Sequence, residues 1–468
     1  MSRLVVVSNR VADLRNPAQS GGLAVALGDA LKESGGLWFG WDGNVAAADQ
    51  SLAPSSMVHE GVTTVTVPLT QRDFDEYYLG FANRALWPVF HFRLDLAEFA
   101  GAFLEGYRRV NGRFADALIK VLRPNDEIWV HDYHLIPLGA ELRARRIRRP
   151  IGFFLHIPFP PPDVLVATPE HDWLARSLFA YDVVGLQTEG DLSNFQRYVL
   201  DHCQGTIGAD GLISAFGETI IARSFPIGID VDSFAATART HDAEQRITLL
   251  HQQTLHRTLI IGVDRLDYSK GLPERLKSFR SLLEHFPEHR KAVTLMQIAA
   301  PTREDVGAYA DIRQELEGLS GAINGEFSDF DWTPVRYIHR SMPRDVLAAL
   351  FRGCQVGMVT PLRDGMNLVA KEYIAAQRPE DPGVLVLSKF AGAAEELREA
   401  VIVNPYDFDE VAAGLRTAIG MPLEERRERH RTLFKRIRTR DVRHWRESFL
   451  SALRGARAVT VSAGGLNS

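Results

Sequence analysis

Short apolar runs rich in β-branched residues alternate with amphipathic segments along most of this chain. In the first half the predicted strands span 4–7, 37–39, 63–67, 128–130, 152–155 and 183–186, and the predicted helices span 22–32, 103–121, 138–145, 171–180 and 191–200. In the second half, predicted strands at 259–263, 293–298, 335–338, 356–359, 384–387 and 401–403 alternate with helices in the same way. This alternation is typical of parallel βαβ units and predicts an α/β protein with doubly wound sheets.

The length of 468 residues predicts more than one domain, because a single hydrophobic core rarely extends so far. An extended run that ends in a Pro/Gly turn at 226–230 is the predicted joint between an N-terminal domain, 1–230, and a C-terminal domain, 231–440. A helix over 441–454, with Trp445 and Phe449 on one face, is predicted to cross back to the first domain. The small and polar segment 455–468 is expected to be a loosely held tail.

The composition excludes several classes of protein. A net charge of -5 and a pI near 6.3 give no general attraction for nucleic acid, so any phosphate must meet local basic sites. Two distant cysteines, Cys203 and Cys354, exclude a disulfide scaffold or a zinc ribbon and fit a reducing compartment. No apolar run reaches membrane-spanning length, and the N-terminus has no signal-peptide pattern. We therefore expect a cytoplasmic protein without nucleic-acid or membrane partners.

The stretch 360–373 connects a buried strand to a helix through a polar loop that contains Gly365. The first N–H groups of such a helix have no internal partner and attract phosphate. Asp364 stands at the loop tip, where a sugar hydroxyl can reach it, and Glu372 is one turn into the helix, where it can accept hydrogen bonds from ribose hydroxyls. Alternatively, Asp364 only caps the helix and Glu372 lies on a solvated face.

A second loop, 262–272, also follows a strand and leads into a helix. Arg265 and Lys270 place two cations on this loop, where they can bind a pyrophosphate. Arg265 can instead pair with Asp264 or Asp267 in a purely structural role. Arg303 follows the next strand and is predicted to project toward the same region.

In the first half, polar residues again follow strands, which is where open α/β sheets bind ligands. Arg10 follows the first strand, and Gly21-Gly22 either lets backbone N–H groups approach a diphosphate or forms a plain turn. The pattern is not GxGxxG, which makes a nicotinamide cofactor a weak hypothesis. Tyr78 and Trp87 are candidates for the walls of a sugar site, although a buried Trp is more often core.

Two histidine motifs follow the strands at 128–130 and 152–155. His131 and His134 flank Asp132 and could suggest a metal, but no third ligand has suitable spacing. For His156, a core histidine and a substrate contact are equally good interpretations of the sequence alone.

Taken together, these motifs resemble those of the retaining trehalose-6-phosphate synthases, in order, from residue 2 to about residue 449. The segments that carry the resemblance are 8–10, 21–23, 38–41, 75–78, 86–88, 131–135, 154–160, 265–271 and 363–372. The last two are the most specific. The resemblance implies a glycosyltransferase of the B-type architecture, with two Rossmann-like domains that face each other across a cleft.

The resemblance also implies an activity: transfer of glucose, with retention, from UDP-glucose or another nucleotide-glucose to glucose 6-phosphate, giving α,α-trehalose 6-phosphate, a stress protectant's precursor. It implies catalytic roles for Arg265, Lys270, Asp364 and His156. The implied donor-binding residues are Gly22, Arg265, Lys270, Met342, Leu368, Val369, Ala370, Lys371 and Glu372, and the implied acceptor-binding residues are Arg10, Tyr78, Trp87, Asp132 and Arg303. Met342 departs from the aromatic or other residue that the family often has beside the base, which leaves base selectivity open.

The family is thought to use a front-face route, in which the departing phosphate takes the proton of the incoming hydroxyl, so we expect no metal and no cofactor. A homo-oligomer is also expected. Three alternatives remain: a related transferase such as a glucosylglycerol-phosphate synthase, with another phosphorylated acceptor; a phosphorylase with lysine-bound pyridoxal phosphate; and a non-catalytic sugar-phosphate sensor. Intact Arg265, Lys270, Asp364 and Glu372 argue against the sensor.

Overall fold

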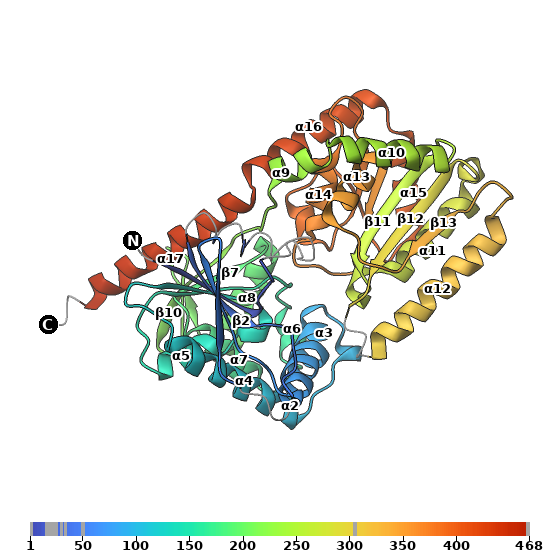
Figure 1. Cartoon of the computed structure of the whole chain (residues 1–468). Coiled ribbons are helices and arrows are strands. Elements are labelled where there is room, and N and C mark those ends of the chain that lie inside the picture. The colour runs from blue at the N-terminus through green and yellow to red at the C-terminus, as the bar shows by residue number, and fades with distance from the viewer. Residues whose placement is uncertain are drawn as a thin grey trace. The chain divides into compact units, whose positions relative to one another are not determined.

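The computed structural model describes residues 3–14, 27–28, 31, 35–47, 52–302 and 307–464, with only the backbone described at 307–308 and 457–464. The chain forms two compact units (Figure 1). The first comprises residues 1–227 together with 443–468, and the second comprises residues 228–442. The first junction lies within the predicted joint at 226–230, and the second lies two residues beyond the predicted end of the second domain at 440.

The first unit contains one ten-stranded sheet, in the order β3-β4-β2-β1-β5-β6-β7-β10-β9-β8. Its strands are β1 (Leu4–Arg10), β2 (Gly36–Trp41), β3 (Ser55–His59), β4 (Val62–Thr66), β5 (Glu127–His131), β6 (Ile151–Phe154), β7 (Val183–Leu186), β8 (Thr206–Ile207), β9 (Leu212–Ala215) and β10 (Glu218–Ser224). The six strands from β4 to β7 are all parallel, in the order typical of a doubly wound fold. The order reverses between β1 and β5, so ligands are expected at the carboxyl ends of these two strands.

Helices of the first unit connect these strands. The helical segments are α2 (Gln71–Asp73), the π-helix η2 (Phe74–Leu86), α3 (Trp87–Phe90), η3 (Leu94–Leu96), α4 (Gly101–Ile119), η4 (Tyr133–Leu135), α5 (Leu138–Ala144), α6 (Pro162–Leu165), α7 (His171–Leu178) and α8 (Glu189–His202). The predicted helix at 22–32 lies largely outside the described residues. A π-helix is rare and often marks a functional region.

The C-terminal helix α17 (Val442–Gly464) packs on the first sheet. Phe449 is fully buried, and its ring stacks on Trp129 of β5 at 4.7 Å between centroids. Gly152 and Gly185 leave room for this ring, because a Cβ at either position would lie within 3 Å of it. The helix continues to Gly464, beyond residue 454 where it was expected to end.

The second unit has a six-stranded, fully parallel sheet in the order β13-β12-β11-β14-β15-β16. Its strands are β11 (Thr258–Arg265), β12 (Val293–Ala300), β13 (Val335–Ile338), β14 (Val356–Val359), β15 (Val384–Ser388) and β16 (Val401–Val403). The order reverses between β11 and β14, which makes their carboxyl ends the expected ligand site of this unit.

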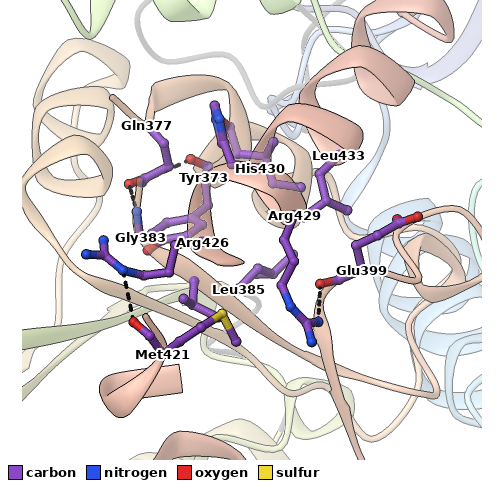
Figure 2. Close-up of a pocket in the computed structure, with 12 residues that line it drawn as sticks. Tyr373, Gln377, Gly383, Leu385, Glu399, Met421, Arg426, Arg429, His430 and Leu433 are labelled. Carbon is purple, nitrogen blue, oxygen red and sulfur yellow. Dashed lines mark hydrogen bonds between the residues drawn. The ribbon is translucent and has the colours of Figure 1, made fainter. Parts of the chain in front are cut away.

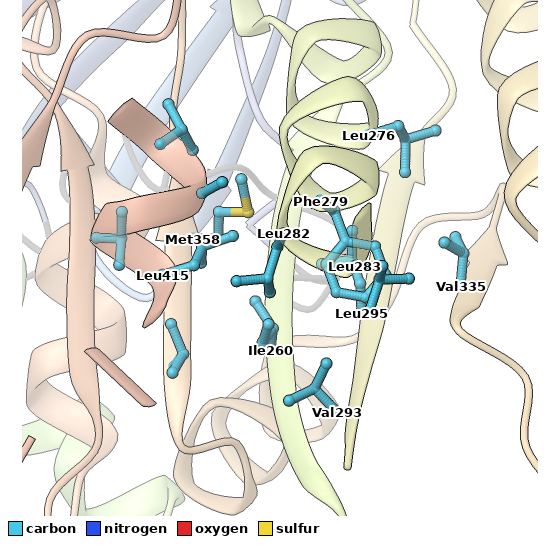
Figure 3. Packing of buried hydrophobic residues seen from close by; sticks show 14 of the residues in the cluster. Ile260, Leu276, Phe279, Leu282, Leu283, Val293, Leu295, Val335, Met358 and Leu415 are labelled. Atoms are coloured by element: carbon cyan, nitrogen blue, oxygen red, sulfur yellow. The ribbon is translucent and has the colours of Figure 1, made fainter. Parts of the chain in front are cut away.

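Its helical segments are α9 (Val231–Thr237), α10 (His241–Gln253), η5 (Tyr268–Lys270), α11 (Leu272–His285), η6 (Pro287–His289), α12 (Gly307–Phe327), α13 (Arg344–Gly353), α14 (Leu368–Ala376), η7 (Gly392–Glu395), α15 (Phe408–Gly420) and α16 (Leu423–Thr439). Buried residues of α11, α12 and α15 form one hydrophobic cluster with the sheet. Figure 3 shows Phe279 and Leu283 of α11 packed against Leu295 of β12. This core fixes the sheet, and the sheet fixes the loops at its carboxyl edge.

Among the described residues, no helix is long and apolar enough to cross a membrane.

Candidate active site

The loop between β14 and α14 is shaped by Asn367, whose backbone is left-handed at φ 74. The Asn367 side chain is the N-cap: its Oδ1 accepts a hydrogen bond from the N–H of Ala370 at 3.3 Å. The N–H groups of Leu368 and Val369 precede this capped position and have no partner inside the helix. Together with the helix dipole, they form an end that favours an anion. Asn367 therefore takes the capping role that the alternative interpretation gave to Asp364.

Asp364 instead forms an ion pair with Lys270, with 2.6 Å between Nζ and Oδ2. The same carboxylate oxygen accepts a hydrogen bond from the Asn367 amide at 3.0 Å. Only 10% of the Lys270 side chain and 13% of the Asp364 side chain are exposed, so the pair is partly shielded from water. The structure thus brings together two residues that the sequence placed on separate loops.

These two loops lie directly against each other at the switch point of the second sheet. The N–H of Leu362 donates to the carbonyl of Ser269 at 2.9 Å. Gly271, with φ +62, makes this approach possible, because a Cβ there would lie 2.8 Å from the Thr360 carbonyl oxygen. A substitution of Gly271 would therefore push the lysine loop away from the aspartate loop.

A third segment, which sequence reasoning missed, holds the Asp364 loop from the other side. The N–H of Asp364 donates to Phe390 at 3.2 Å, and the Asp364 carbonyl accepts from the N–H of Gly392 at 3.1 Å. The N–H of Ala393 donates to the Met366 carbonyl at 2.8 Å. The small residues at 391–394, directly after a predicted strand, were the available signal for such a close backbone contact.

Arg265 is the exposed last residue of β11. Its neighbour Asp264 pairs with Arg275 of α11 at 2.7 Å, and both side chains are buried. Burial raises the pKa of Asp264, although Arg275 and Lys270 oppose the shift. Asp267 caps the short helix η5 by accepting from the N–H of Ser269 at 2.9 Å. Arg275 of α11, which the sequence did not single out, is therefore the ion-pair partner of Asp264.

The structure separates the roles of Lys371 and Glu372 on α14. The Lys371 side chain is buried and its Nζ lies 2.6 Å from Glu396, which is also buried. In this geometry the Lys371 side chain anchors the helix, and donor binding at Lys371 stays a prediction. Glu372 is half-buried, and burial raises its pKa to about 7 while Arg344 opposes the shift. Met342 is half-buried and lies two residues before α13, which begins at Arg344.

In the first unit, Asp132 and His156 lie side by side at the ends of β5 and β6. The Asp132 carboxylate accepts a hydrogen bond from the backbone N–H of His156 at 3.1 Å. Asp132 has φ 77, a conformation that non-glycine residues rarely adopt and that often marks functional sites. Burial lowers the pKa of His156 to about 3, so its imidazole is neutral at physiological pH. A neutral imidazole can offer a hydrogen bond but not a positive charge.

Tyr78 lies within the π-helix η2 and Trp87 directly follows it, and the two side chains differ in exposure. Tyr78 is half-buried and stacks on His134, with 5.9 Å between ring centroids. Trp87 is only 3% exposed and packs on His91 at 4.1 Å, as expected for a core side chain. Arg10 is the exposed last residue of β1.

Two of the predicted site residues, Gly22 and Arg303, lie outside the described residues. Within the part of the chain that is described, no three His, Cys, Asp or Glu side chains are grouped so that they could hold a metal ion.

A pocket lies beside the C-terminal part of α14 (Figure 2). Tyr373, Gln377, Leu385 and His430 are among its lining residues. The side-chain amide oxygen of Gln377 accepts a hydrogen bond from the backbone N–H of Gly383 at 2.9 Å. None of the predicted site residues lines this pocket, so it is not the expected substrate site.

Two parallel-sheet units with polar residues at their switch points define the class: a glycosyltransferase of the B-type architecture, as predicted. The chain belongs to glycosyltransferase family 20, whose sequence model matches residues 5–455. This confirms the resemblance inferred from the motifs.

Named relatives agree with this assignment. The chain is 47% identical to the trehalose-6-phosphate synthase of Enterobacter sp. (strain 638), over 97% of this chain and 95% of the relative. It is 50% identical, with a TM-score of 0.94, to a UDP-forming α,α-trehalose-phosphate synthase from Burkholderia xenovorans solved with glucose-6-phosphate, covering 97% of this chain and 100% of that one. It is 46% identical, with a TM-score of 0.92, to an E. coli protein bound to UDP-2-fluoro glucose. This match covers 97% of this chain and 99% of that one.

Proposed function

We propose that this protein transfers glucose from UDP-glucose to glucose 6-phosphate and releases α,α-trehalose 6-phosphate and UDP. The observation that carries the proposal is the match to this family along nearly the whole chain, at 46–50% identity to structures that contain glucose-6-phosphate or a UDP-glucose analogue. Fold alone would not support an activity, because one fold hosts many reactions. Here the polar residues at both switch points agree with the activity as well.

The donor is assigned to the second unit. The start of α14 supplies two N–H groups at Leu368 and Val369 and the positive end of a helix, which together suit a diphosphate. Lys270 stands on the adjacent loop, and Arg265 ends the neighbouring strand. Glu372, on the first turns of the same helix, is assigned to the ribose hydroxyls. Asp364, which is held in place by Lys270 and Asn367, is assigned to a hydroxyl of the transferred glucose.

Most of the acceptor contacts are assigned to residues of the first unit. Arg10 ends β1, where an exposed guanidinium can bind the phosphate of glucose 6-phosphate in a bidentate manner. Asp132 and Tyr78 are assigned to the sugar ring, and Arg303 to the phosphate. Trp87 is too buried to be a large contact surface, so its contribution is assigned to the shape of the site.

In the proposed reaction the bond between the anomeric carbon and the β-phosphate oxygen breaks, and its electron pair stays on the phosphate. The anomeric hydroxyl of glucose 6-phosphate attacks the same face of that carbon, and its proton passes to the departing phosphate oxygen. This order of events retains the configuration without a carboxylate nucleophile. The protein contributes orientation and the stabilisation of negative charge on the leaving group by Arg265, Lys270 and the helix start.

We propose that these cations do the work that a divalent ion does in other glycosyltransferases, so that no metal or cofactor is needed. Activity that persists after dialysis against a chelator would support this part of the proposal. Loss of activity that Mg²⁺ or Mn²⁺ restores would overturn it, because the side chains would then be insufficient alone.

The proposal is tested by measuring nucleotide diphosphate release with each sugar nucleotide against glucose 6-phosphate, and by identifying the product by NMR. The expected result is a non-reducing disaccharide phosphate with an α,α linkage, formed fastest from UDP-glucose. A parallel screen offers glycerol 3-phosphate and unphosphorylated glucose as acceptors. Faster turnover with glycerol 3-phosphate than with glucose 6-phosphate would replace the proposed acceptor.

A further inference from the structure

The histidines that follow β5 and β6 form a direct pair. His131 Nδ1 lies 3.0 Å from His156 Nε2, which is a hydrogen-bond distance. One of the two nitrogens must therefore carry the hydrogen and the other must accept it. The choice matters because it decides what His156 offers at its other ring nitrogen, Nδ1.

The surroundings of His131 distinguish the two arrangements. Its side chain is completely buried, and its Nε2 has no hydrogen-bond partner among the described residues. The rings of Trp129 and Trp445 pack beside it, with centroids at 4.5 Å and 6.2 Å. The indole N–H groups of both tryptophans are likewise buried without a partner in the described chain. This cluster therefore contains N–H donors but no acceptor that could satisfy another one.

If His156 donated to His131, the hydrogen of His131 would sit on Nε2 and add a third unsatisfied donor to this cluster. If His131 donates, its Nε2 is a bare lone pair that faces aromatic rings and N–H groups. A buried orphaned N–H is rarer in proteins than an under-satisfied acceptor. The second arrangement is therefore the favourable one. Burial also lowers the pKa of both imidazoles, which keeps the pair neutral.

We propose that His131 is a positioning residue: its Nδ1–H donates to His156 Nε2 and fixes His156 in the tautomer that carries hydrogen on Nδ1. His156 then presents an N–H donor to a hydroxyl of the transferred glucose. The contact between Asp132 and the backbone N–H of His156 fixes the same residue from a second side. The C-terminal helix contributes as well, because Trp445 covers the pair. This inference rests on the proposed role of His156 in glucose binding.

The tautomer can be read without any substrate, by long-range ¹H–¹⁵N NMR of the full chain labelled with ¹⁵N-histidine. His156→Gln assigns the His156 signals by their disappearance. The expected result at neutral pH is hydrogen on Nδ1 of both residues. Hydrogen on Nε2 of His156 would overturn the proposal, whatever reaction the protein catalyses.

Three variants then connect the tautomer to catalysis. His131→Asn keeps an N–H donor near the position of Nδ1 and should retain the tautomer and most of kcat. His131→Leu removes the donor, and His131→Asp replaces it with an acceptor that selects hydrogen on Nε2 of His156. Both should lower kcat more than tenfold, with the KM for glucose 6-phosphate nearly unchanged and with wild-type circular dichroism. Equal loss in the Asn and Asp variants, or wild-type kcat in the Asp variant, would refute the positioning role. A wild-type protein with the expected tautomer but no transferase activity would instead refute the proposed function.

Discussion

The ammonium group of Lys270 lies 2.6 Å from the carboxylate of Asp364, and this ion pair joins the two loops at the switch point of the second sheet. The sheet order requires this proximity, because β11 and β14 are direct neighbours although about ninety residues separate them along the chain. Asp364 also accepts from Asn367, the cap of α14. A cation, a carboxylate and a helix start are thereby held as one rigid group, which suits a site that must stabilise charge without reorganising.

Replacing Lys270 by alanine should lower kcat by about 10²–10³-fold, because a positioned charge near the leaving group acts mainly in the transition state. The KM for glucose 6-phosphate should change little, since Lys270 is not among the residues assigned to the acceptor. Steady-state kinetics with both substrates varied would measure the two effects separately.

Lys277→Ala is the matched control, because Lys277 lies on the helix that follows Lys270 but forms an exposed ion pair with Glu315. Such surface pairs contribute little, so this variant should behave as wild type. Near-normal turnover in the Lys270 variant would argue that the leaving group binds elsewhere.

Glu372 should make donor binding dependent on pH. Burial raises its pKa to about 7, so the carboxylate accepts from ribose hydroxyls above pH 7 and is protonated below it. The KM for UDP-glucose should therefore rise as the pH falls from 8 to 6, while the KM of Glu372→Gln should stay high and flat. If the KM for UDP-glucose of the Gln variant depends on pH in the same way as that of the wild type, Glu372 is not the source of this pH dependence.

The same raised pKa predicts that Glu372 makes the folded protein less stable at high pH, where its carboxylate favours donor binding. The folded protein holds the Glu372 proton more tightly than the unfolded chain does, so this contribution to stability is present at low pH and is lost as the pH rises from about 4.5 to about 7. In the ligand-free protein, Glu372→Gln should therefore raise Tm more at pH 8 than at pH 5.5. This is the pattern expected where a site is tuned for binding at the expense of stability.

Arg10 should determine the preference for a phosphorylated acceptor. Losing one charge-assisted contact costs about 1.5–3 kcal/mol, so Arg10→Ala should raise the KM for glucose 6-phosphate by about 10–100-fold. Turnover of unphosphorylated glucose, measured at high concentration, should be unaffected. Arg93→Ala, which removes an exposed arginine paired with Asp95, is a suitable control in the same unit. An equal loss with both acceptors would show that Arg10 does not bind the phosphate.

The parallel sheets could be predicted from the sequence because buried parallel strands are continuous apolar runs that stand out from polar loops. The predicted strand at 356–359 matches β14 at both ends, and the predicted strand at 183–186 matches β7. The antiparallel hairpin of β9 and β10 was not predicted, since its strands are partly exposed and β10 carries polar residues such as Glu218 and Arg223. No helix was predicted over the π-helix at 74–86.

The positions of Lys270 and Asp364 beyond the ends of two neighbouring strands could be predicted, because each residue follows an apolar run in the sequence. The sequence could not show which charged residues face a ligand and which face each other. Lys371 and Arg275 are both buried partners of acidic residues on other segments of the chain, Glu396 and Asp264. Such pairings depend on how the helices pack on the sheet, which no local pattern encodes.

The buried pair of Lys371 and Glu396 provides a direct test of whether the Lys371 side chain only anchors α14. Lys371→Met removes the closest cation from Glu396, which keeps an ion pair with Arg440 at 3.3 Å, and should destabilise the protein by about 3–5 kcal/mol, because a buried carboxylate loses its main partner. Adding Glu396→Leu should recover much of this loss, since apolar side chains of similar volume often replace a buried ion pair without cost. Chemical denaturation of the two single variants and the double variant measures the coupling.

At a temperature where the double variant is folded, its KM for UDP-glucose should match wild type if Lys371 only anchors α14. A large rise in that KM would restore Lys371 as a donor contact and would require α14 to move when the donor binds.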